Sequence, residues 1–210
     1  MERKDIVKII EAEKLVLVTR LKDSKQASMV LKSLIDVGVK VMEITSNTPN
    51  FEEEITKARK LFPDVLIGAG TVINKEIAKK AINAGAQFIV TPNTDISLIK
   101  IAHNNNIPIL MGALTPTEVC TASEAGADFV KLFPADIMGV PYFKSIKAPL
   151  DKVKLFAVGG IELDSVQDWF NAGAMGIGIA SVLQEPDNCP IDLAEVESRI
   201  AKFVKHIKSS

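Results

Sequence analysis

The sequence predicts an α/β fold, a closed (β/α)8 barrel, on three observations. β-branched runs alternate with amphipathic helical segments along the 210 residues, as in a parallel sheet built from βα units. A Gly-containing phrase recurs at the end of every second helical segment. No Ser-, Pro- or Gly-rich linker interrupts the chain, so residues 1–210 are expected to form a single domain that begins with a short N-terminal helix.

Eight strands are expected from the β-branched runs. They cover residues 15–19, 39–44, 65–69, 88–91, 109–111, 129–132, 155–158 and 175–179. Polar residues that suit helix N-caps stand between the strands, for example Ser24, Asn74 and Asp95, each followed by apolar residues at helical spacing. The Thr-Pro-Thr-Glu sequence at 115–118 matches a capping box with Pro in the first turn.

A phrase in which Gly stands between two Ala or Val residues marks alternate units. It occurs at residues 37–39, 84–86, 125–127 and 172–174, with the Gly residues 47, 41 and 47 positions apart. Each Gly stands where a left-handed helix cap is wanted, just before a strand. Because each interval spans two βα units, the phrases mark every second strand, and in a TIM barrel alternate strands contribute one layer of inward side chains.

The phrases also predict which side chains point into the barrel. The fourth residue after each Gly is apolar, as expected beneath the helices; these residues are Met42, Ile89, Val130 and Ile177. Because strand side chains alternate, the third and fifth residues share the opposite face. The fifth residues are Glu43, Val90, Lys131 and Gly178. Glu43 and Lys131 are therefore expected in one interior layer at the C-terminal mouth of the barrel.

Composition argues against several classes of partner. The formal charge is −1, with one Trp and one Tyr, so a nucleic-acid partner is not expected. No apolar run reaches the ~18 residues of a membrane span, and the N-terminus does not resemble a signal peptide, so a cytoplasmic protein is expected. Cys120, Cys189, His103 and His206 stand without ligand partners at metal spacing, so no metal site is expected.

Charged residues inside apolar strands are the most informative feature, because Lys and Glu are rarely buried without a partner. A structural ion pair between Glu43 and Lys131 would explain them, but buried pairs are poor stabilisers. A desolvated amine instead loses part of its preference for the charged form and can attack a carbonyl to give a Schiff base. A neighbouring carboxylate can then move protons between the intermediates. The sequence therefore favours Lys131 as nucleophile and Glu43 as acid and base.

Small residues follow the seventh and eighth expected strands, at 157–161 and 176–181. Barrels commonly hold a phosphate there on backbone N–H groups, although Gly also serves tight turns. The segments at 68–71 and 91–93 add small and polar groups to the same face. Arg20 ends the first strand and suits a substrate carboxylate, the alternative being a solvated side chain.

Taken in order, the motifs resemble those of class I 2-keto-3-deoxy-6-phosphogluconate (KDPG) and 4-hydroxy-2-oxoglutarate (KHG) aldolases. The resemblance runs from about residue 10 to the end of the chain. The motifs that carry it are Glu43-Ile44-Thr45, Gly68-Ala69-Gly70-Thr71-Val72, Thr115-Pro116-Thr117-Glu118, Lys131-Leu132-Phe133-Pro134-Ala135 and Val158-Gly159-Gly160-Ile161.

The resemblance implies a homotrimer of (β/α)8 barrels without metal or cofactor, in which Lys131 forms the Schiff base and Glu43 is the acid and base. It also implies a set of substrate contacts: Arg20 and Thr71 at the pyruvate carboxylate, Pro92 and Phe133 in the pocket wall, and Gly159, Gly160 and Ser181 at the phosphate.

Two positions depart from patterns common in that family. Many members have Arg in the segment 46–48, where Asn47 cannot make the same bidentate carboxylate contact, so carboxylate binding is expected to depend more on Arg20. Members specific for the gluconate epimer often carry Thr before the Gly pair, whereas Val158 resembles the 6-phosphogalactonate enzymes. The substrate epimer stays open.

The sequence thus predicts a lyase that cleaves a 2-keto-3-deoxy-6-phospho sugar acid, or 4-hydroxy-2-oxoglutarate, to pyruvate and an aldehyde such as D-glyceraldehyde 3-phosphate. The substrate is a small phosphorylated keto acid, and neither nucleic acid nor membrane is an expected partner. One alternative is a phosphate-binding isomerase or epimerase, which would not need a strand-borne Lys. The other is a ligand-binding barrel without turnover, which would gain nothing from burying both Glu43 and Lys131.

Overall fold

The strands of the computed structural model close into one parallel barrel. The structure describes residues 1–20, 24–180 and 192–209. Within them, the strands are neighbours in chain order and the last pairs with the first. They are β1 (Leu15–Thr19), β2 (Val41–Thr45), β3 (Leu66–Gly70), β4 (Ile89–Val90), β5 (Ile109–Ala113), β6 (Phe129–Leu132), β7 (Leu155–Val158) and β8 (Gly176–Ile179). The predicted barrel is therefore confirmed.

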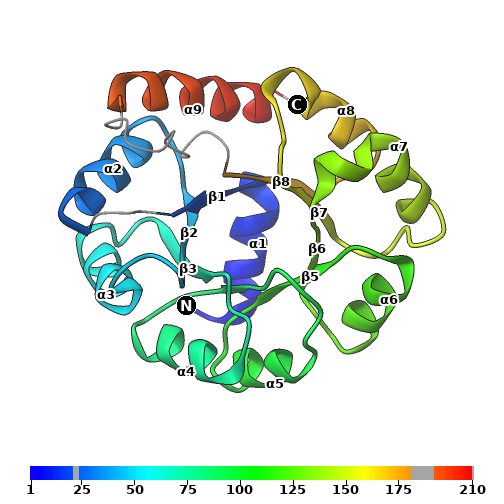
Figure 1. Ribbon diagram of the computed structural model, residues 1–210, viewed down its shortest axis with the longest axis horizontal. Helices are drawn as coiled ribbons and strands as arrows, with labels where there is room; N and C mark the ends of the chain where they lie inside the picture. Colours follow the sequence, from blue (N-terminus) through cyan, green and yellow to red (C-terminus); the bar gives the residue numbers. More distant parts are fainter. Residues whose placement is uncertain (21–23, 181–191, 210) are drawn as a thin grey trace.

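The helices that follow the first strand surround this barrel on the outside, whereas the N-terminal helix is seen across its centre, as Figure 1 shows. Along the chain the helices are α1 (Arg3–Glu13), α2 (Ser24–Asp36), α3 (Phe51–Leu61), α4 (Lys75–Asn83), α5 (Ser97–Asn104), α6 (Pro116–Glu124), α7 (Ala135–Lys147), the 3-10 turn η1 (Leu163–Ser165), α8 (Val166–Asn171) and α9 (Leu193–Lys208). α7 is kinked where Gly139 leaves helical geometry ahead of Pro141. No helix in the described ranges is long and apolar enough to cross a membrane.

The predicted helix starts have a side-chain basis. Asn74 accepts a hydrogen bond from Ile77 N–H at 2.9 Å, as an N-cap does. Thr115 and Glu118 form the predicted capping box. At α5 the prediction is wrong by one residue: the N-cap position is Ile96, and Asp95 before it accepts from the backbone N–H of Ser97 at 3.0 Å. α2 begins at Ser24, whose side chain lies outside the described part.

The four Gly phrases behave as predicted. Gly38, Gly85, Gly126 and Gly173 have φ values of 102°, 93°, 94° and 95°. These angles lie in the left-handed region that glycine enters without a steric penalty. The same backbone turn therefore ends α2, α4, α6 and α8 and starts the following even-numbered strand.

The alternation of side chains along the strands is also confirmed. Buried residues separate into a larger cluster beneath the helices and a smaller one inside the barrel. The larger cluster contains the fourth residues, Met42, Ile89, Val130 and Ile177. The interior cluster contains third residues, Val41, Phe88 and Phe129, together with Val90. Glu43 and Lys131 stand two residues beyond Val41 and Phe129, so their side chains point into the barrel.

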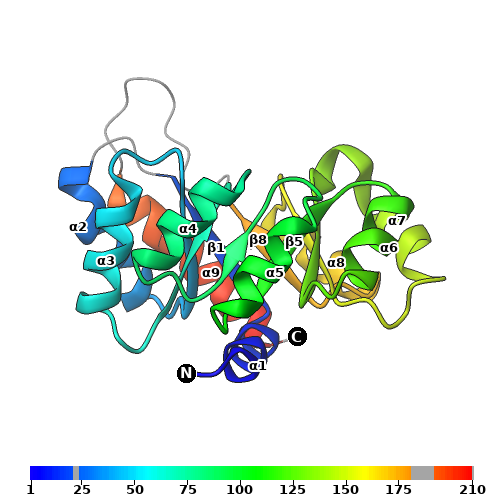
Figure 2. The same cartoon turned by 90° about the horizontal axis from the view of Figure 1, so that it is seen from below.

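α1 closes one end of the barrel. Ile6 and Ile10 of α1 are buried in the interior cluster, and Glu11 is 2.6 Å from Lys154 Nζ just before β7. α1 leads directly into β1, so it covers the amino-terminal ends of the strands, and Figure 2 shows it beneath the barrel. The carboxyl ends of the strands, where the catalytic loops of such barrels lie, are therefore at the opposite end from α1.

Strand ends differ from the prediction in five strands. β3, β5 and β8 cover 66–70, 109–113 and 176–179 instead of 65–69, 109–111 and 175–179. β2 begins at Val41, two residues later than expected, and β4 covers only 89–90 instead of 88–91. Beyond β4, the Thr91 hydroxyl accepts from Gly112 N–H at 2.9 Å and donates to the Asn93 carbonyl at 2.7 Å. Thr91 N–H still donates to the Leu110 carbonyl at 3.1 Å, but its hydroxyl takes the Gly112 N–H that the next step of the ladder would use.

Candidate active site

Lys131 on β6 and Glu43 on β2 are the charged side chains of the barrel interior. Lys131 is 6% exposed and Glu43 is 1% exposed. In the sheet, Lys131 is level with Gly112 and Glu43 is level with Gly68. Both neighbours are glycines against which other groups pack closely: a Cβ atom at Gly68 would overlap the Phe88 ring, and one at Gly112 would overlap the Pro92 backbone.

Close backbone packing holds the Glu43 carboxylate in place. A Cβ atom at Gly70 would overlap Glu43 Oε1, so glycine is needed at the end of β3. The Thr19 hydroxyl donates to the Glu43 carbonyl and fixes the backbone from the other side. Within the described part of the chain, Glu43 Oε2 is buried without a hydrogen-bond partner. An unsatisfied buried carboxylate oxygen is costly, so this atom is suited to accept a proton or a substrate hydroxyl.

Burial shifts both titrating groups toward their neutral forms. Burial raises the pKa of Glu43 above its ordinary value, although the positive charges of Lys131 and Arg20 act in the opposite direction. Burial lowers the pKa of Lys131. The negative charge of Glu43 raises this pKa, whereas the positive charge of Arg20 lowers it further. A lysine with a lowered pKa supplies neutral amine at lower pH than a solvated one. The pair therefore combines a nucleophile with a group that can hold a proton.

Phe133 and Pro92 lie beside this pair. The Phe133 ring centroid is 4.8 Å from Lys131 Nζ, and Phe133 is 37% exposed. Its ring would be 3.2 Å from a Cβ atom at Gly159, so Gly159 gives the ring room. A Cβ atom at Gly112 would overlap the Pro92 backbone, which brings the 91–93 loop against β5. The structure thus brings both predicted wall residues to the carboxyl end of the barrel.

The Gly159–Gly160 pair has a neighbour that sequence reasoning missed. Gly160 has a φ of 62°, and a Cβ atom there would overlap the Asp136 carboxylate. Asp136 N–H also donates to the Gly159 carbonyl at 3.2 Å. No backbone carbonyl in the described ranges accepts from the N–H groups of Gly159 and Gly160. The backbone N–H donors that the sequence predicts at Gly159 and Gly160 are therefore available, but the Asp136 carboxylate lies beside Gly160.

Val158 and Ser181 complete the predicted distal contacts. Val158 is 6% exposed and packs in the interior cluster, level with Gly178 on β8. A Cβ atom at Gly178 would lie 2.8 Å from Val158 Cγ2, so the β8 glycine makes room for this side chain. Ser181 lies outside the described residues.

Arg20 and Thr71 stand at the carboxyl ends of β1 and β3. Arg20 Nε donates to Asn47 Oδ1 at 3.3 Å, and both residues are exposed. Thr71 has a φ of 56°, and its carbonyl accepts from the Ser46 hydroxyl at 2.7 Å. The sequence indicates only that Asn47 cannot make a bidentate contact with a carboxylate. The structure shows that Asn47 instead accepts a hydrogen bond from Arg20.

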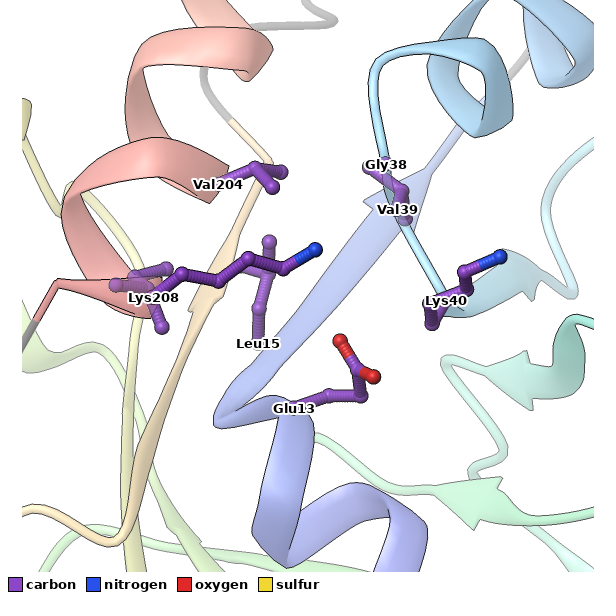
Figure 3. Close-up of a pocket in the computed structure, with 8 residues that line it drawn as sticks. Glu13, Leu15, Gly38, Val39, Lys40, Val204 and Lys208 are labelled. Carbon is purple, nitrogen blue, oxygen red and sulfur yellow. The ribbon is translucent and has the colours of Figure 1, made fainter.

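Possible metal ligands do not gather into a second centre in the described chain. No group of three His, Cys, Asp or Glu side chains there could hold a metal ion. His103 Nε2 is 3.0 Å from Asp128 Oδ2, near the amino end of β6. A cavity of about 10 Å³ lies between the start of β1, the turn at Gly38 and α9, with Lys208 reaching across it (Figure 3). That volume holds at most one water molecule.

Comparisons with known proteins agree with this geometry. The family model for KDPG and KHG aldolase matches residues 6–198. The 2-dehydro-3-deoxy-6-phosphogalactonate aldolase of Escherichia coli (strain K12) is 36% identical over 175 residues, covering 82% of this chain and 84% of that protein. The 2-dehydro-3-deoxy-phosphogluconate aldolase of Treponema pallidum (strain Nichols) is 32% identical over 165 residues, covering 78% and 79%.

Solved structures are similar over almost the whole chain. A structure described as native KDPGal superposes with a TM-score of 0.86 at 32% identity, covering 93% of this chain and 94% of that chain. A KDPG aldolase from Zymomonas mobilis ZM4, solved with 3-phosphoglycerate, gives a TM-score of 0.84 at 27% identity, covering 96% and 95%. The chain belongs to the KDPG and KHG aldolase family.

Proposed function

We propose that this aldolase cleaves a 2-keto-3-deoxy-6-phospho sugar acid to pyruvate and D-glyceraldehyde 3-phosphate through a Schiff base on Lys131. One observation carries the proposal: a buried amine and a buried carboxylate lie in the same barrel interior, at the end that α1 leaves open. An isomerase or a non-catalytic barrel would not need this pair.

The reaction begins at the Lys131 amine. Its neutral form attacks the C2 ketone, and loss of water gives an iminium ion. Glu43, directly or through a water molecule, takes the proton of the C4 hydroxyl. The C3–C4 bond then breaks, its electron pair moves toward the iminium nitrogen to form an enamine, and the aldehyde leaves.

The second half of the cycle returns the proton. Glu43, now protonated, delivers it to C3 of the enamine and regenerates the iminium ion. Water adds at C2, and hydrolysis frees pyruvate and the Lys131 amine. The iminium accepts the electrons, so this sequence of steps needs no metal or organic cofactor.

Charged and apolar groups around the pair suit the pyruvate part of the substrate. Arg20 supplies a guanidinium that raises the positive field at Glu43 and Lys131. We assign it to the substrate carboxylate, with Thr71 beside it. The Phe133 ring and the Pro92 backbone would flank the methyl or methylene carbon of the bound keto acid.

We assign the substrate phosphate to the loop that follows β7. The support is the pair of N–H groups at Gly159 and Gly160, held in positive-φ geometry. Val158 precedes them in the interior, where it would face the C4 region, so the choice of epimer depends on this side chain. Ser181 is the further expected phosphate contact.

We also propose a homotrimer. Two exposed apolar side chains lie at the carboxyl end of the barrel on neighbouring βα units. Ile73 precedes α4 and is 51% exposed, and Ile96 precedes α5 and is 48% exposed. At the same end of α7, Ile137 is 77% exposed. Burial of such residues favours association. Light scattering should then give about three times the mass of a 22.7 kDa chain, and a monomer mass would contradict the assembly.

A substrate panel tests the proposed function. The 6-phosphogluconate- and 6-phosphogalactonate-derived keto acids and 4-hydroxy-2-oxoglutarate are each assayed for pyruvate release. At least one phosphorylated compound should be cleaved, and cleavage should persist in EDTA. Release of pyruvate from none of the three would contradict the assignment.

A further inference from the structure

Two loops at the mouth of the barrel are joined by one side-chain hydrogen bond. β1 and β2 are parallel neighbours, with Thr19 level with Ile44, so Arg20 after β1 stands near the end of β2. There Arg20 Nε donates to Asn47 Oδ1 at 3.3 Å. The contact spans 27 residues of sequence and links the guanidinium to the next strand's loop.

The loop that carries Asn47 is anchored on both sides. The Ser46 hydroxyl donates to the Thr71 carbonyl at 2.7 Å. Thr48 N–H donates to the Thr45 carbonyl at 2.9 Å, and their hydroxyl oxygens are 3.3 Å apart. Asn47 therefore projects from a turn whose backbone is fixed. Arg20, in contrast, is a long exposed side chain with many rotamers, which is costly to order at the moment of binding.

The hydrogen-bond partner of Arg20 is the neutral amide of Asn47, so the contact between them is not an ion pair. An amide oxygen accepts from Nε without cancelling the guanidinium charge. In the described part of the chain, no carboxylate pairs with Arg20 within 4.0 Å. The two terminal nitrogens keep their donors for a planar anion. Arg20 also acts on the pKa values of Glu43 and Lys131, so it lies within electrostatic reach of both.

We propose that Asn47 is a positioning residue that aims the Arg20 guanidinium at the carboxylate of the keto acid while leaving its charge intact. This inference rests on the proposed function, in which Arg20 binds that carboxylate. In the sequence, Asn47 marked a position that lacks the carboxylate-binding Arg of many family members. In this proposal, Asn47 instead orders Arg20, which is the carboxylate ligand that this chain retains.

The test uses the full chain, with pyruvate as the probe and borohydride to trap the adduct. Labelling is measured as a function of pyruvate concentration. Asn47→Ala should raise the half-saturating pyruvate concentration by about fivefold to tenfold, the equivalent of one hydrogen bond. The maximal extent of labelling should stay the same. Asn47→Asp should raise the half-saturating concentration further, because the new charge pairs with Arg20 and repels the carboxylate.

Matched variants separate positioning from a general structural effect. Asn105→Ala removes another exposed asparagine, whose Nδ2 donates to the Ile101 carbonyl at 2.9 Å at the far end of the barrel, and should leave pyruvate saturation unchanged. In an Arg20→Ala background, Asn47→Ala should add nothing, because its effect passes through the missing guanidinium.

The outcomes distinguish this inference from the proposed function. Wild-type labelling with an unchanged half-saturating concentration in Asn47→Ala would overturn the role of Asn47 and leave the aldolase intact. An additional loss in the Arg20→Ala background would also overturn it. If wild-type protein takes no label at all, the proposed function fails and the inference falls with it.

Discussion

Gly70 lies directly against the Glu43 carboxylate, so closely that a single methyl group at residue 70 would overlap Glu43 Oε1. Gly70 ends β3 and Glu43 stands in the middle of β2, so the shape of one strand sets the position of the proposed catalytic carboxylate on its neighbour. The absence of a side chain at Gly70 is therefore part of the site.

Gly70→Ala should displace the Glu43 carboxylate and impair proton transfer. Turnover should fall by about 10²-fold or more, comparable to Glu43→Gln, since a positioned acid or base contributes about 10² to 10⁴. Both variants should still trap pyruvate on Lys131. Steady-state cleavage and borohydride labelling measure the two effects, and full turnover in Gly70→Ala would show that the carboxylate is free to move.

The rate of adduct formation should depend on pH through Lys131. Burial lowers its pKa, so deprotonation to the reactive amine occurs at lower pH than for a solvated lysine. The initial labelling rate should therefore rise with pH and level off below the ordinary lysine value. Glu43→Gln removes the charge that opposes this shift, so its midpoint should move to lower pH. A midpoint at the ordinary lysine value in wild-type protein would contradict the desolvated amine.

Gly160→Asp should weaken the binding of phosphorylated substrates. The new carboxylate would stand against the phosphate, and the Asp136 side chain already occupies the adjacent space. KM should rise sharply for the phosphorylated keto acids and much less for 4-hydroxy-2-oxoglutarate. Gly126→Asp is the matched control, because Gly126 has a φ of 94° and open space around it at the other end of the barrel. Equal losses on both substrate types would exclude the phosphate assignment.

Val158→Thr should shift the preference between epimers. The substitution keeps the branched shape in the interior and adds a hydroxyl that can bind the C4 hydroxyl of one configuration. The ratio of kcat/KM values should move toward the gluconate epimer by about 1 kcal/mol, roughly fivefold. An unchanged ratio would show that another residue reads the stereochemistry.

Much of the fold could be predicted because its determinants are periodic and local. The Gly residues at 38, 85, 126 and 173 need positive φ, and their spacing locates the even-numbered strands. Counting from them places Glu43 and Lys131 on the inward face, because strand side chains alternate. No β-bulge intervenes in β2 or β6, so the register holds.

Loop contacts could not be predicted in the same way. Asp136 lies over Gly160, and Asn47 contacts Arg20, because segments far apart in the sequence meet in space, and no periodic pattern marks such contacts. The end of β4 also differs from the prediction, since the Thr91 hydroxyl replaces a backbone carbonyl as the acceptor for Gly112 N–H. Side chains that bond to nearby backbone compete with the sheet, and sequence pattern alone does not show which competitor wins.

Trapping with pyruvate and borohydride tests the central claim most directly. Among the described lysines, Lys131 is the one that the barrel register turns inward, and it is buried within electrostatic reach of Glu43. Peptide mapping should therefore find one reduced pyruvyl group per chain, on the peptide that contains Lys131, and Lys131→Ala should lose both the label and turnover. A label on another lysine, or pyruvate release that survives Lys131→Ala and is abolished by EDTA, would contradict the Schiff-base mechanism.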